Sequence, residues 1–194
     1  MGPIDWRLAV KGLAGFIVGL ALWLMLSPLY DRAIATGAEK VMRVFETPKV
    51  TRLVPMPDGS IRVDRSDFDP RSPRPGIRVS DLTFNFALLT ALFAVSRRTF
   101  SDRNIGGFFA ASAILALTHI VATIARVMSI YVAKLGAWSR VTYSDFDRNV
   151  WGIADHGYRL VFMYAFAFGL WFLFRDTASV APAGAKAKTK RRKK

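Results

Sequence analysis

The sequence predicts an all-α integral membrane protein with about four transmembrane helices and a small periplasmic β-appendage between helices 1 and 2. The 194 residues combine a mean hydropathy of +0.25 with a net charge of +14, so apolar and charged residues must be segregated along the chain. Four stretches are rich in apolar residues, and basic residues gather in some of the connections. The chain has no cysteine, which excludes disulfides, thiolate metal sites and cysteine nucleophiles.

The first apolar stretch, residues 8–30, carries no charge after Lys11. A helix needs about 20 apolar residues to cross a hydrocarbon core of about 30 Å, so this stretch is long enough to span. A cleaved signal peptide is the alternative, because residues 33–35 (Ala-Ile-Ala) resemble a small-residue cleavage site. The stretch is longer than the 7–15 apolar residues typical of a signal peptide, and an uncleaved anchor is therefore expected.

The segment after this anchor changes its pattern twice. Residues 31–45 have apolar side chains at helical spacing, so the first helix should continue outward or lie on the membrane surface. Residues 49–55 and 60–63 are β-branched runs on either side of an Asp-Gly turn, which indicates a β-hairpin. Residues 67–75 contain three prolines and are expected to form a connector without regular structure. The appendage is too small to have a core of its own.

Three further stretches complete the predicted bundle. The second, residues 82–96, is short for a span and can cross only if the helix also includes residues from Arg78 onward. A re-entrant or buried helix is the alternative. The third, residues 105–135, is long enough to cross. The fourth, residues 158–174, is rich in aromatic residues and is followed by Arg175.

The distribution of charge predicts the orientation. Residues 97–104 hold three arginines against one aspartate, and basic residues also precede the first span and follow the fourth. The other two connections, residues 46–81 and 136–157, hold seven basic against six acidic residues and two against three. Because basic loops stay on the cytoplasmic side, four spans in an inner membrane with both termini in the cytoplasm place every basic cluster inside.

These observations divide the chain into four segments. Residues 1–44 hold the cytoplasmic N-terminus, the first span and its outer extension, and residues 45–81 form the periplasmic segment. Residues 82–175 form a three-span bundle, and residues 176–194 form a disordered basic cytoplasmic tail. The tail is expected to bind anionic lipid headgroups. It lacks the interleaved aromatic residues of a nucleic-acid-binding segment, so nucleic acid is not an expected partner.

Ionisable residues within predicted spans are candidates for function, because burying them in a membrane is costly. His119 lies near the middle of the third span, and Arg126 lies two helical turns further on. The predicted topology also brings His156 and either Asp81 or Thr83 to the depth of Arg126, near the outer leaflet. Such a group could stabilise an oxyanion and transfer protons.

A structural role is the alternative for the same residues. Arg126 could pair with Asp81 or Asp155, and His119 could hydrogen-bond a neighbouring threonine or a helix carbonyl. The two histidines lie at different predicted depths, which argues against a haem held between them. The sequence has no nucleotide-binding or zinc-protease motif, so neither a cofactor nor a metal is expected.

The order of these features resembles the core of exosortases and archaeosortases. Residues 80–94, the basic loop 96–107, residues 115–127 with Arg126 and residues 154–162 with His156 follow one another as they do in that family. The resemblance covers residues 80–174 and implies multi-span transpeptidases with an extracytoplasmic Cys–Arg–His site. The cysteine is missing here; Asp81 and Thr83 stand near its place, and cysteine transpeptidase chemistry is excluded.

Residues 83–92 and the outer appendage are more similar to the exosortase H-associated membrane proteins. This similarity implies a non-catalytic accessory protein of an exosortase-type sorting system, with a sortase-type membrane protein as its partner. The alternative is a divergent membrane hydrolase or transferase that uses Asp81 or Thr83 together with Arg126 and His156. A small lipid-binding or transport-related protein is a third hypothesis, although the sequence shows no discontinuous-helix signature.

Overall fold

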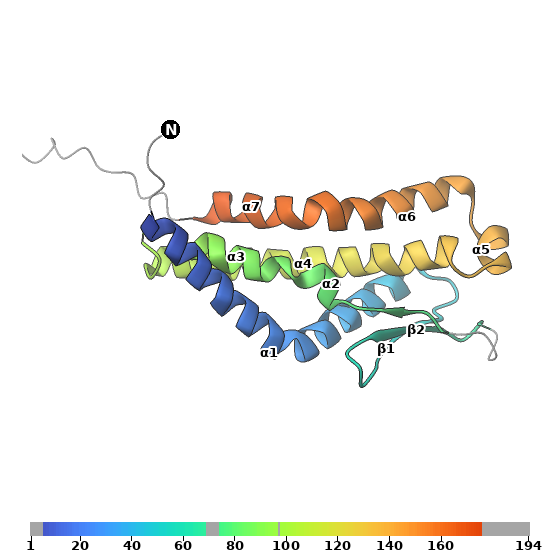
Figure 1. Cartoon of the computed structure of the whole chain (residues 1–194). Coiled ribbons are helices and arrows are strands. Elements are labelled where there is room, and N and C mark those ends of the chain that lie inside the picture. The colour runs from blue at the N-terminus through green and yellow to red at the C-terminus, as the bar shows by residue number, and fades with distance from the viewer. Residues whose placement is uncertain (1–5, 69–73, 97, 176–194) are drawn as a thin grey trace, which may run out of the picture.

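A computed structural model describes residues 6–68, 74–96 and 98–175. Long helices dominate it, with a small sheet packed against one side (Figure 1). Its helices are α1 (Trp6–Phe45), α2 (Ser80–Thr83), α3 (Asn85–Ala94), α4 (Asp102–Ala133), α5 (Ala137–Thr142), α6 (Asp145–Gly157), the π-helical turn η1 (Tyr158–Phe162) and α7 (Met163–Phe174). The predicted tail, residues 176–194, and Arg97 of the predicted basic loop lie outside the described residues.

Three helical rods are long and apolar enough to cross a membrane: α1, α4 and the continuous rod α6–η1–α7. They agree with the predicted first, third and fourth spans. The second predicted span is the pair α2 and α3, which covers only residues Ser80–Ala94. At about 1.5 Å per residue this segment is shorter than the hydrocarbon core of a bilayer, as its marginal length in the sequence predicted.

The α3 helix packs along the first half of α1. Contact is close because α1 presents Gly15 and Gly19 to α3: a Cβ atom at Gly19 would lie 3.0 Å from the backbone of Ala87. Glycine at such a spacing lets two membrane helices approach to backbone contact. The short segment is thereby held against the longest helix of the bundle.

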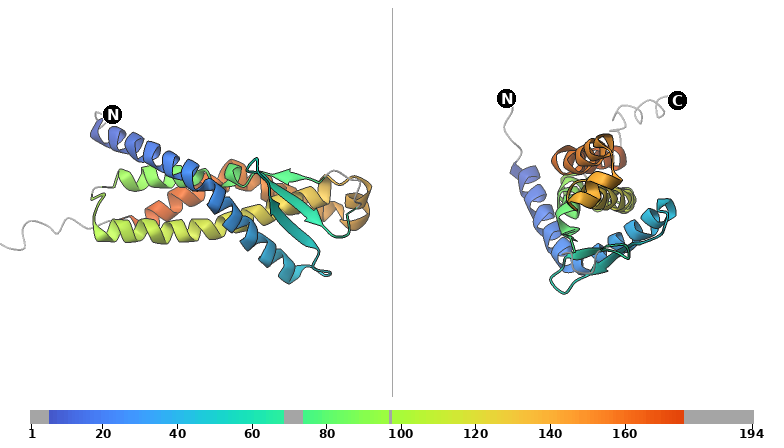
Figure 2. Two further views of the ribbon diagram at one scale, coloured as in Figure 1. Left: turned by 90° about the horizontal axis from the view of Figure 1, so that it is seen from below. Right: turned by 90° about the vertical axis from the view of Figure 1, so that its right-hand side faces the viewer.

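The start of α1, the end of α3, the start of α4 and the end of α7 lie at one end of the molecule, here called the terminus end (Figures 1 and 2). Ser101 caps α4 there, its Oγ accepting a hydrogen bond from the Asn104 amide at 3.2 Å. The Asn104 side chain donates in turn to the carbonyl oxygens of Phe93 and Thr99, at 3.3 and 2.9 Å. The connection between α3 and α4 is closed by these bonds.

The opposite end, here called the sheet end, carries the sheet, α5 and the outer half of α1. Helix α1 contains Pro28 and bends midway along its length (Figure 1), as expected where proline removes a backbone hydrogen bond. Beyond the bend it stays helical to Phe45. Of the two alternatives predicted for residues 31–45, continuation of the first helix is the one that the structure shows.

The sheet has the antiparallel strand order β1-β2-β3, with β1 (Thr51–Pro55), β2 (Ile61–Arg65) and β3 (Gly76–Ile77). The first two strands form the predicted hairpin. Its turn uses Gly59 at φ +78°, a backbone conformation that favours glycine, and Asp58 Oδ1 accepts a hydrogen bond from the Ser60 amide at 3.0 Å. The two-residue strand β3 was not predicted, and much of the proline-rich connector lies outside the described residues.

The largest buried core joins the sheet to the two long helices. One face of the hairpin packs onto the outer half of α1 and the outer end of α4, so the sheet shares its core with the bundle. The buried members are Ile34, Ala35, Ala38, Met42, Leu53, Ile61, Val63, Ile77, Val79, Val127, Ile130 and Tyr131. As predicted, the appendage is stabilised by docking rather than by a core of its own.

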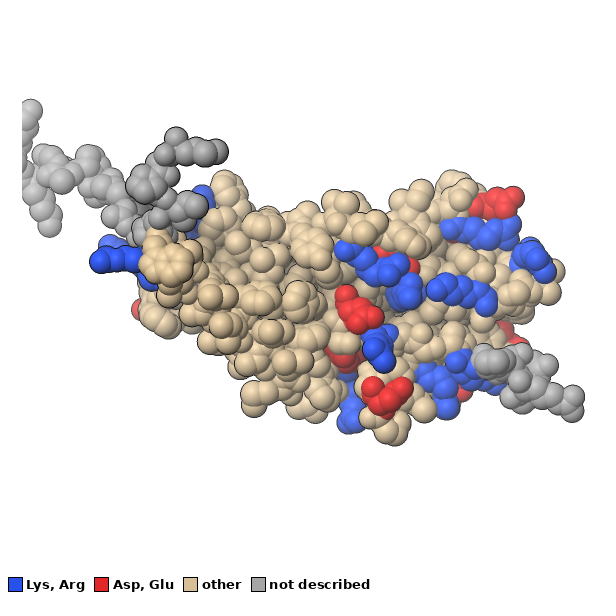
Figure 3. Space-filling view, viewed as in Figure 1, with Lys and Arg blue, Asp and Glu red and all other residues tan. Residues whose placement is uncertain are grey.

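Charged side chains are segregated on the surface. Figure 3 shows Lys, Arg, Asp and Glu over the sheet end, a smaller basic group at the terminus end, and a broad uncharged band between them. Large apolar side chains are exposed along α1, for example Leu13, Leu24 and Met25 at 62, 60 and 77%. An exposed apolar band of this extent is typical of a surface that contacts lipid or another protein.

Candidate functional site

A row of polar side chains follows one face of α4. His119, Thr123, Arg126 and Ser129 are three or four residues apart, the spacing of one helical face. His119 and Thr123 are fully buried and Ser129 is 6% exposed. This face is turned toward the interior of the bundle, where an ionisable residue marks a candidate functional site.

His119 is held by both of its ring nitrogens. Its Nδ1 lies 2.7 Å from the Tyr30 hydroxyl of α1, and its Nε2 lies 2.8 Å from Asn85 Oδ1 of α3. The Asn85 amide also donates to the Met163 carbonyl oxygen at 2.8 Å, beside the π-helical turn η1. The partners differ from the predicted threonine or carbonyl. This histidine of α4 contacts α1 and α3 directly and α7 through Asn85, and both of its ring nitrogens are engaged, which supports a structural role.

Substitution of Asn85 tests this network. Asn85→Ala removes two hydrogen bonds, each of which is typically worth about 0.6–1.7 kcal/mol inside a membrane, so we expect the free energy of unfolding to fall by about 1–2 kcal/mol. Tyr30→Phe removes only one bond and should cost about half as much. Thermal unfolding of the purified chain in mild detergent measures both, and equal stability of the wild type and Asn85→Ala would contradict the network.

Arg126 pairs with Asp155, one of the two partners considered from the sequence. The Arg126 Nη1 atom lies 2.8 Å from Asp155 Oδ2, and Arg159 Nη2 lies 3.3 Å from the same oxygen. Ser129 Oγ also donates to this oxygen at 3.2 Å. Asp155 is 1% exposed. Its buried carboxylate is compensated by two arginines and accepts a hydrogen bond from one hydroxyl. The Arg126 guanidinium is therefore held by an ion pair within the bundle.

The other three predicted site residues do not join Arg126. His156 is exposed, and its Nδ1 lies 2.9 Å from the Gly152 carbonyl oxygen of its own helix. Thr83 is buried, and its hydroxyl accepts from Trp23 Nε1 at 3.1 Å. Asp81 is exposed on α2. In the described part of the chain, no hydrogen bond or ion pair links Asp81, Thr83, Arg126 and His156 to one another.

A cavity at the sheet end contains a residue that the sequence reasoning missed. Its volume is about 460 Å³, and it lies between the bend of α1, the hairpin turn and the start of α2. Asp31, only 6% exposed, lines it together with Arg32 and Arg78. A carboxylate so soon after an apolar run was the available signal, because such a residue needs a specific environment.

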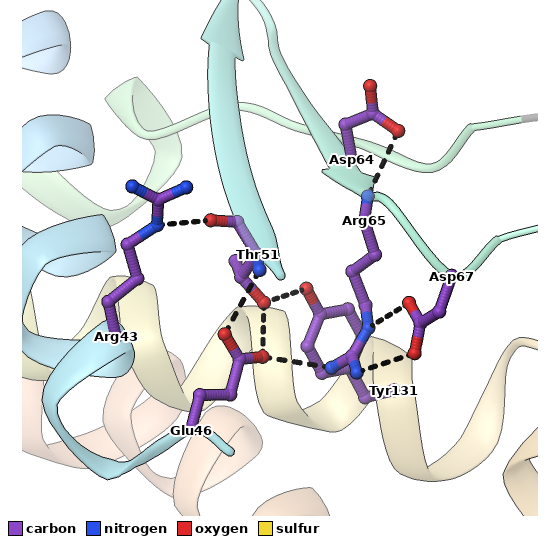
Figure 4. A network of polar contacts seen from close by, with 7 residues as sticks. All are labelled: Arg43, Glu46, Thr51, Asp64, Arg65, Asp67 and Tyr131. Carbon is purple, nitrogen blue, oxygen red and sulfur yellow. Dashed lines mark hydrogen bonds and ion pairs between the residues drawn. The ribbon is translucent and has the colours of Figure 1, made fainter. Parts of the chain in front are cut away.

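A second polar network fastens the sheet to the helices (Figure 4). Arg65 of β2 donates from Nη1 to Glu46 Oε1 at 2.9 Å and, from Nε and Nη2, to both oxygens of Asp67, each at 2.9 Å. These hydrogen bonds from Arg65 hold the pKa of the Asp67 carboxyl below its usual value. The Arg65 guanidinium also lies over the rings of Tyr131 and Trp138, 5.0 and 5.2 Å from their centroids. The guanidinium is thus held by two carboxylates and two aromatic rings, which indicates a docking role.

Comparisons with protein-family models, with curated proteins and with solved structures found no match for this chain. The resemblance to exosortase-associated proteins therefore stays a prediction from sequence motifs.

Proposed function

We propose that this chain is a non-catalytic accessory subunit of an exosortase-type protein-sorting system in a bacterial inner membrane. In this proposal α1, α2–α3, α4 and α6–η1–α7 are the four spans. The terminus end faces the cytoplasm, and the sheet end faces the periplasm. The basic residues at the terminus end and the mixed charges over the sheet (Figure 3) support this orientation.

The observation that carries the proposal is an uncovered apolar stripe on α6. Phe146, Val150 and Ile153 recur at helical spacing and are 74, 42 and 72% exposed, whereas Asp155 of the same helix is buried against α4. The helix thus turns Asp155 inward and these three apolar residues outward, while Asp145 at its start is exposed. An exposed apolar stripe marks a surface that contacts lipid or another protein.

The length of the α6–η1–α7 rod indicates that protein rather than lipid covers the Phe146 end of this stripe. Phe146 precedes Phe174 by 28 residues, which corresponds to about 42 Å of helix. The hydrocarbon core of a bilayer is only about 30 Å thick, so lipid tails that cover α7 do not reach Phe146. A helix or loop of a partner membrane protein, of the sortase type that the motifs imply, would cover it.

The fixed side chains support a non-catalytic role. Arg126 is engaged by Asp155, and the Thr83 hydroxyl already accepts a hydrogen bond from Trp23. A base must come within about 3 Å of the proton that it removes, and no hydrogen bond among the described residues joins His156 to Thr83 or Asp81. The alternative hypothesis of a membrane hydrolase or transferase has correspondingly less support.

Purification from the native membrane tests the proposal. A tagged full-length chain in mild detergent is expected to recover one endogenous multi-span membrane enzyme of the sortase type, identified by mass spectrometry. Phe146→Ser should reduce that recovery at least tenfold, because interface anchors typically contribute more than 1.4 kcal/mol. Phe45→Ser is the matched control, since Phe45 is 82% exposed on the outer half of α1 and lies off the stripe.

Two outcomes would contradict the proposal. One is recovery of no membrane enzyme by the wild-type chain. The other is equal loss of the partner with Phe146→Ser and Phe45→Ser, which would mean that α6 is not the interface. If Thr83→Val and His156→Ala chains, present at normal levels, lose sorting activity while still recovering the partner, the hydrolase or transferase alternative would replace it.

A further inference from the structure

The terminus end has an open groove that neither the polar face of α4 nor the α6 stripe involves. It lies between the first half of α1, the end of α3 and the start of α4, and its volume is about 920 Å³, within the range of ligand-binding pockets. The walls are mostly apolar and include Val18, Phe93 and Phe109. Val18 and Phe109 are 54 and 66% exposed, so the groove opens onto the uncharged band of the surface.

The groove exists because of local sequence. Gly15 contributes no side chain to its floor and lets α1 contact Ala94 of α3 directly. Phe108 and Phe93 stack edge to face, with ring centroids 5.5 Å apart, and form a rigid wall opposite α1. The hydrogen bonds from Asn104 to the α3–α4 connection hold that wall in place.

Two cations lie at the mouth of the groove. Lys11 stands one helical turn before Gly15 on α1, and Arg98 stands in the connection after α3; both side chains are exposed. Within residues 6–68, 74–96 and 98–175 neither forms an ion pair. Thr99 also lines the mouth, where its hydroxyl donates to the Ala94 carbonyl oxygen at 2.9 Å and helps to close the connection that carries Arg98. An apolar trough that ends at two positive charges matches a ligand with an apolar chain and an anionic head.

We propose that this groove binds one anionic phospholipid, with an acyl chain along α1 and α3 and the phosphate between Lys11 and Arg98. Charge complementarity selects this occupant. The C-terminal tail of the chain carries seven basic residues after Arg175 and one acidic residue, so the two cations repel it. Water does not fill the groove favourably because its walls offer few polar partners.

The inference requires that the terminus end lies at the cytoplasmic leaflet, where anionic lipids attract basic residues. It does not depend on the accessory role, because a chain with no sortase-type partner would still present the groove. It also differs from the predicted lipid contact of the basic tail, which is diffuse and lies outside the described residues. The groove holds a single lipid at a defined place.

Lipid retention by the full-length chain is the test. The chain is reconstituted with equal amounts of phosphatidylglycerol and phosphatidylcholine, extracted in mild detergent, and its retained lipids are counted by native mass spectrometry. We expect about one phosphatidylglycerol per chain. Each cation should favour it over phosphatidylcholine about fivefold, so that the two together give roughly 25-fold.

Single substitutions distinguish lipid binding in the groove from lipid binding to surface charge in general. Arg98→Gln and Lys11→Gln should each lower the preference about fivefold. Arg103→Gln is the matched control, because Arg103 is exposed at the same end of the molecule and does not line the groove. All three side chains are exposed, so the variants should fold normally, which their gel-filtration profiles in detergent verify.

A fourth variant tests the apolar part of the groove. Val18→Trp fills it without entering the core and should reduce retention of both lipids. Equal retention of the two lipids by the wild type would overturn the proposal. So would an effect of Arg103→Gln as large as that of Arg98→Gln, or normal retention by Val18→Trp, since either means that lipid binds only to the charged surface. These results leave recovery of the partner through α6 unaffected and test the two proposals separately.

Discussion

Replacing Asp155 by Ala is expected to lower the free energy of unfolding by about 3 kcal/mol, because it leaves two partly buried arginines without their counterion. Asp155 Oδ2 neutralises Arg126 at 2.8 Å and Arg159 at 3.3 Å. Without it, Arg126 of α4 and Arg159 of η1 lie close together as unpaired cations. The apparent melting temperature of the purified chain in mild detergent should fall by about 10 °C, at 2–4 °C per kcal/mol for a chain of this size.

Two comparisons sharpen this experiment. Asp145→Ala removes a carboxylate that is 90% exposed and paired with Arg148 on the same helix, and such surface pairs contribute about 0–1 kcal/mol. The double variant Arg126→Met/Asp155→Leu replaces the pair by apolar side chains and should recover much of the stability lost with Asp155→Ala. Equal stability of Asp155→Ala and Asp145→Ala would show that the buried pair is not formed.

The same double variant distinguishes a structural role of Arg126 from a role in binding or chemistry. If Arg126 only holds the bundle together, a stable Arg126→Met/Asp155→Leu chain should still recover the membrane partner that we propose. Loss of the partner by a stable double variant would assign Arg126 a direct role in binding or chemistry. Protein level in the membrane must be measured alongside, because an unstable variant loses every activity at once.

Local signals in the sequence were sufficient for much of the fold. Apolar runs of adequate length predicted three long helices, and the spacing of residues 31–45 predicted a helix that either continues the first one or lies on the membrane surface. The Asp-Gly turn between β-branched runs predicted the hairpin, because Gly59 supplies the positive φ that the turn requires. Strand β3 has two residues and depends on pairing with Ile61 and Arg62 of β2. A segment this short has no local sequence pattern from which a strand can be predicted.

The candidate site was harder to predict because it depends on helix rotation. Asp155 and His156 are neighbours, and consecutive residues on a helix point about 100° apart. The sequence placed His156 at the depth of Arg126 but could not say which of the two faces α4. Apolar periodicity does not resolve this choice, because Phe146, Val150 and Ile153 of α6 are exposed whereas Asp155 is buried.

The sequence also contains a signal for close helix packing in its first apolar stretch. Gly15 and Gly19 are four residues apart within the first apolar stretch, and small residues at this spacing form close contacts between membrane helices. In the structure they contact α3. The sequence alone does not say which helix will use such a pair, but it does mark one face of α1 as a packing surface.

Replacing Gly19 by Leu should therefore separate α1 from α3. A Cβ atom at this position would lie 2.7 Å from the Thr90 Cβ and 3.0 Å from the Ala87 backbone, and backbone cannot move aside without displacing the helix. Overpacking typically costs 1–3 kcal/mol, and a leucine against backbone should reach about 3 kcal/mol. Gly19→Ala should cost less, because alanine adds only the Cβ atom whereas leucine adds three further carbon atoms.

Gly169→Leu is the matched control for this substitution. Gly169 lies in α7, is exposed, and a Cβ atom there would meet nothing within 4 Å. The change should be neutral or slightly stabilising, because leucine has a higher helix propensity than glycine. Thermal unfolding of the three glycine variants in one detergent should rank Gly19→Leu lowest and Gly169→Leu at or above the wild type. If Gly19→Leu and Gly169→Leu unfold at the same temperature, α1 does not pack on α3 through this face, and the groove between them would be lost with it.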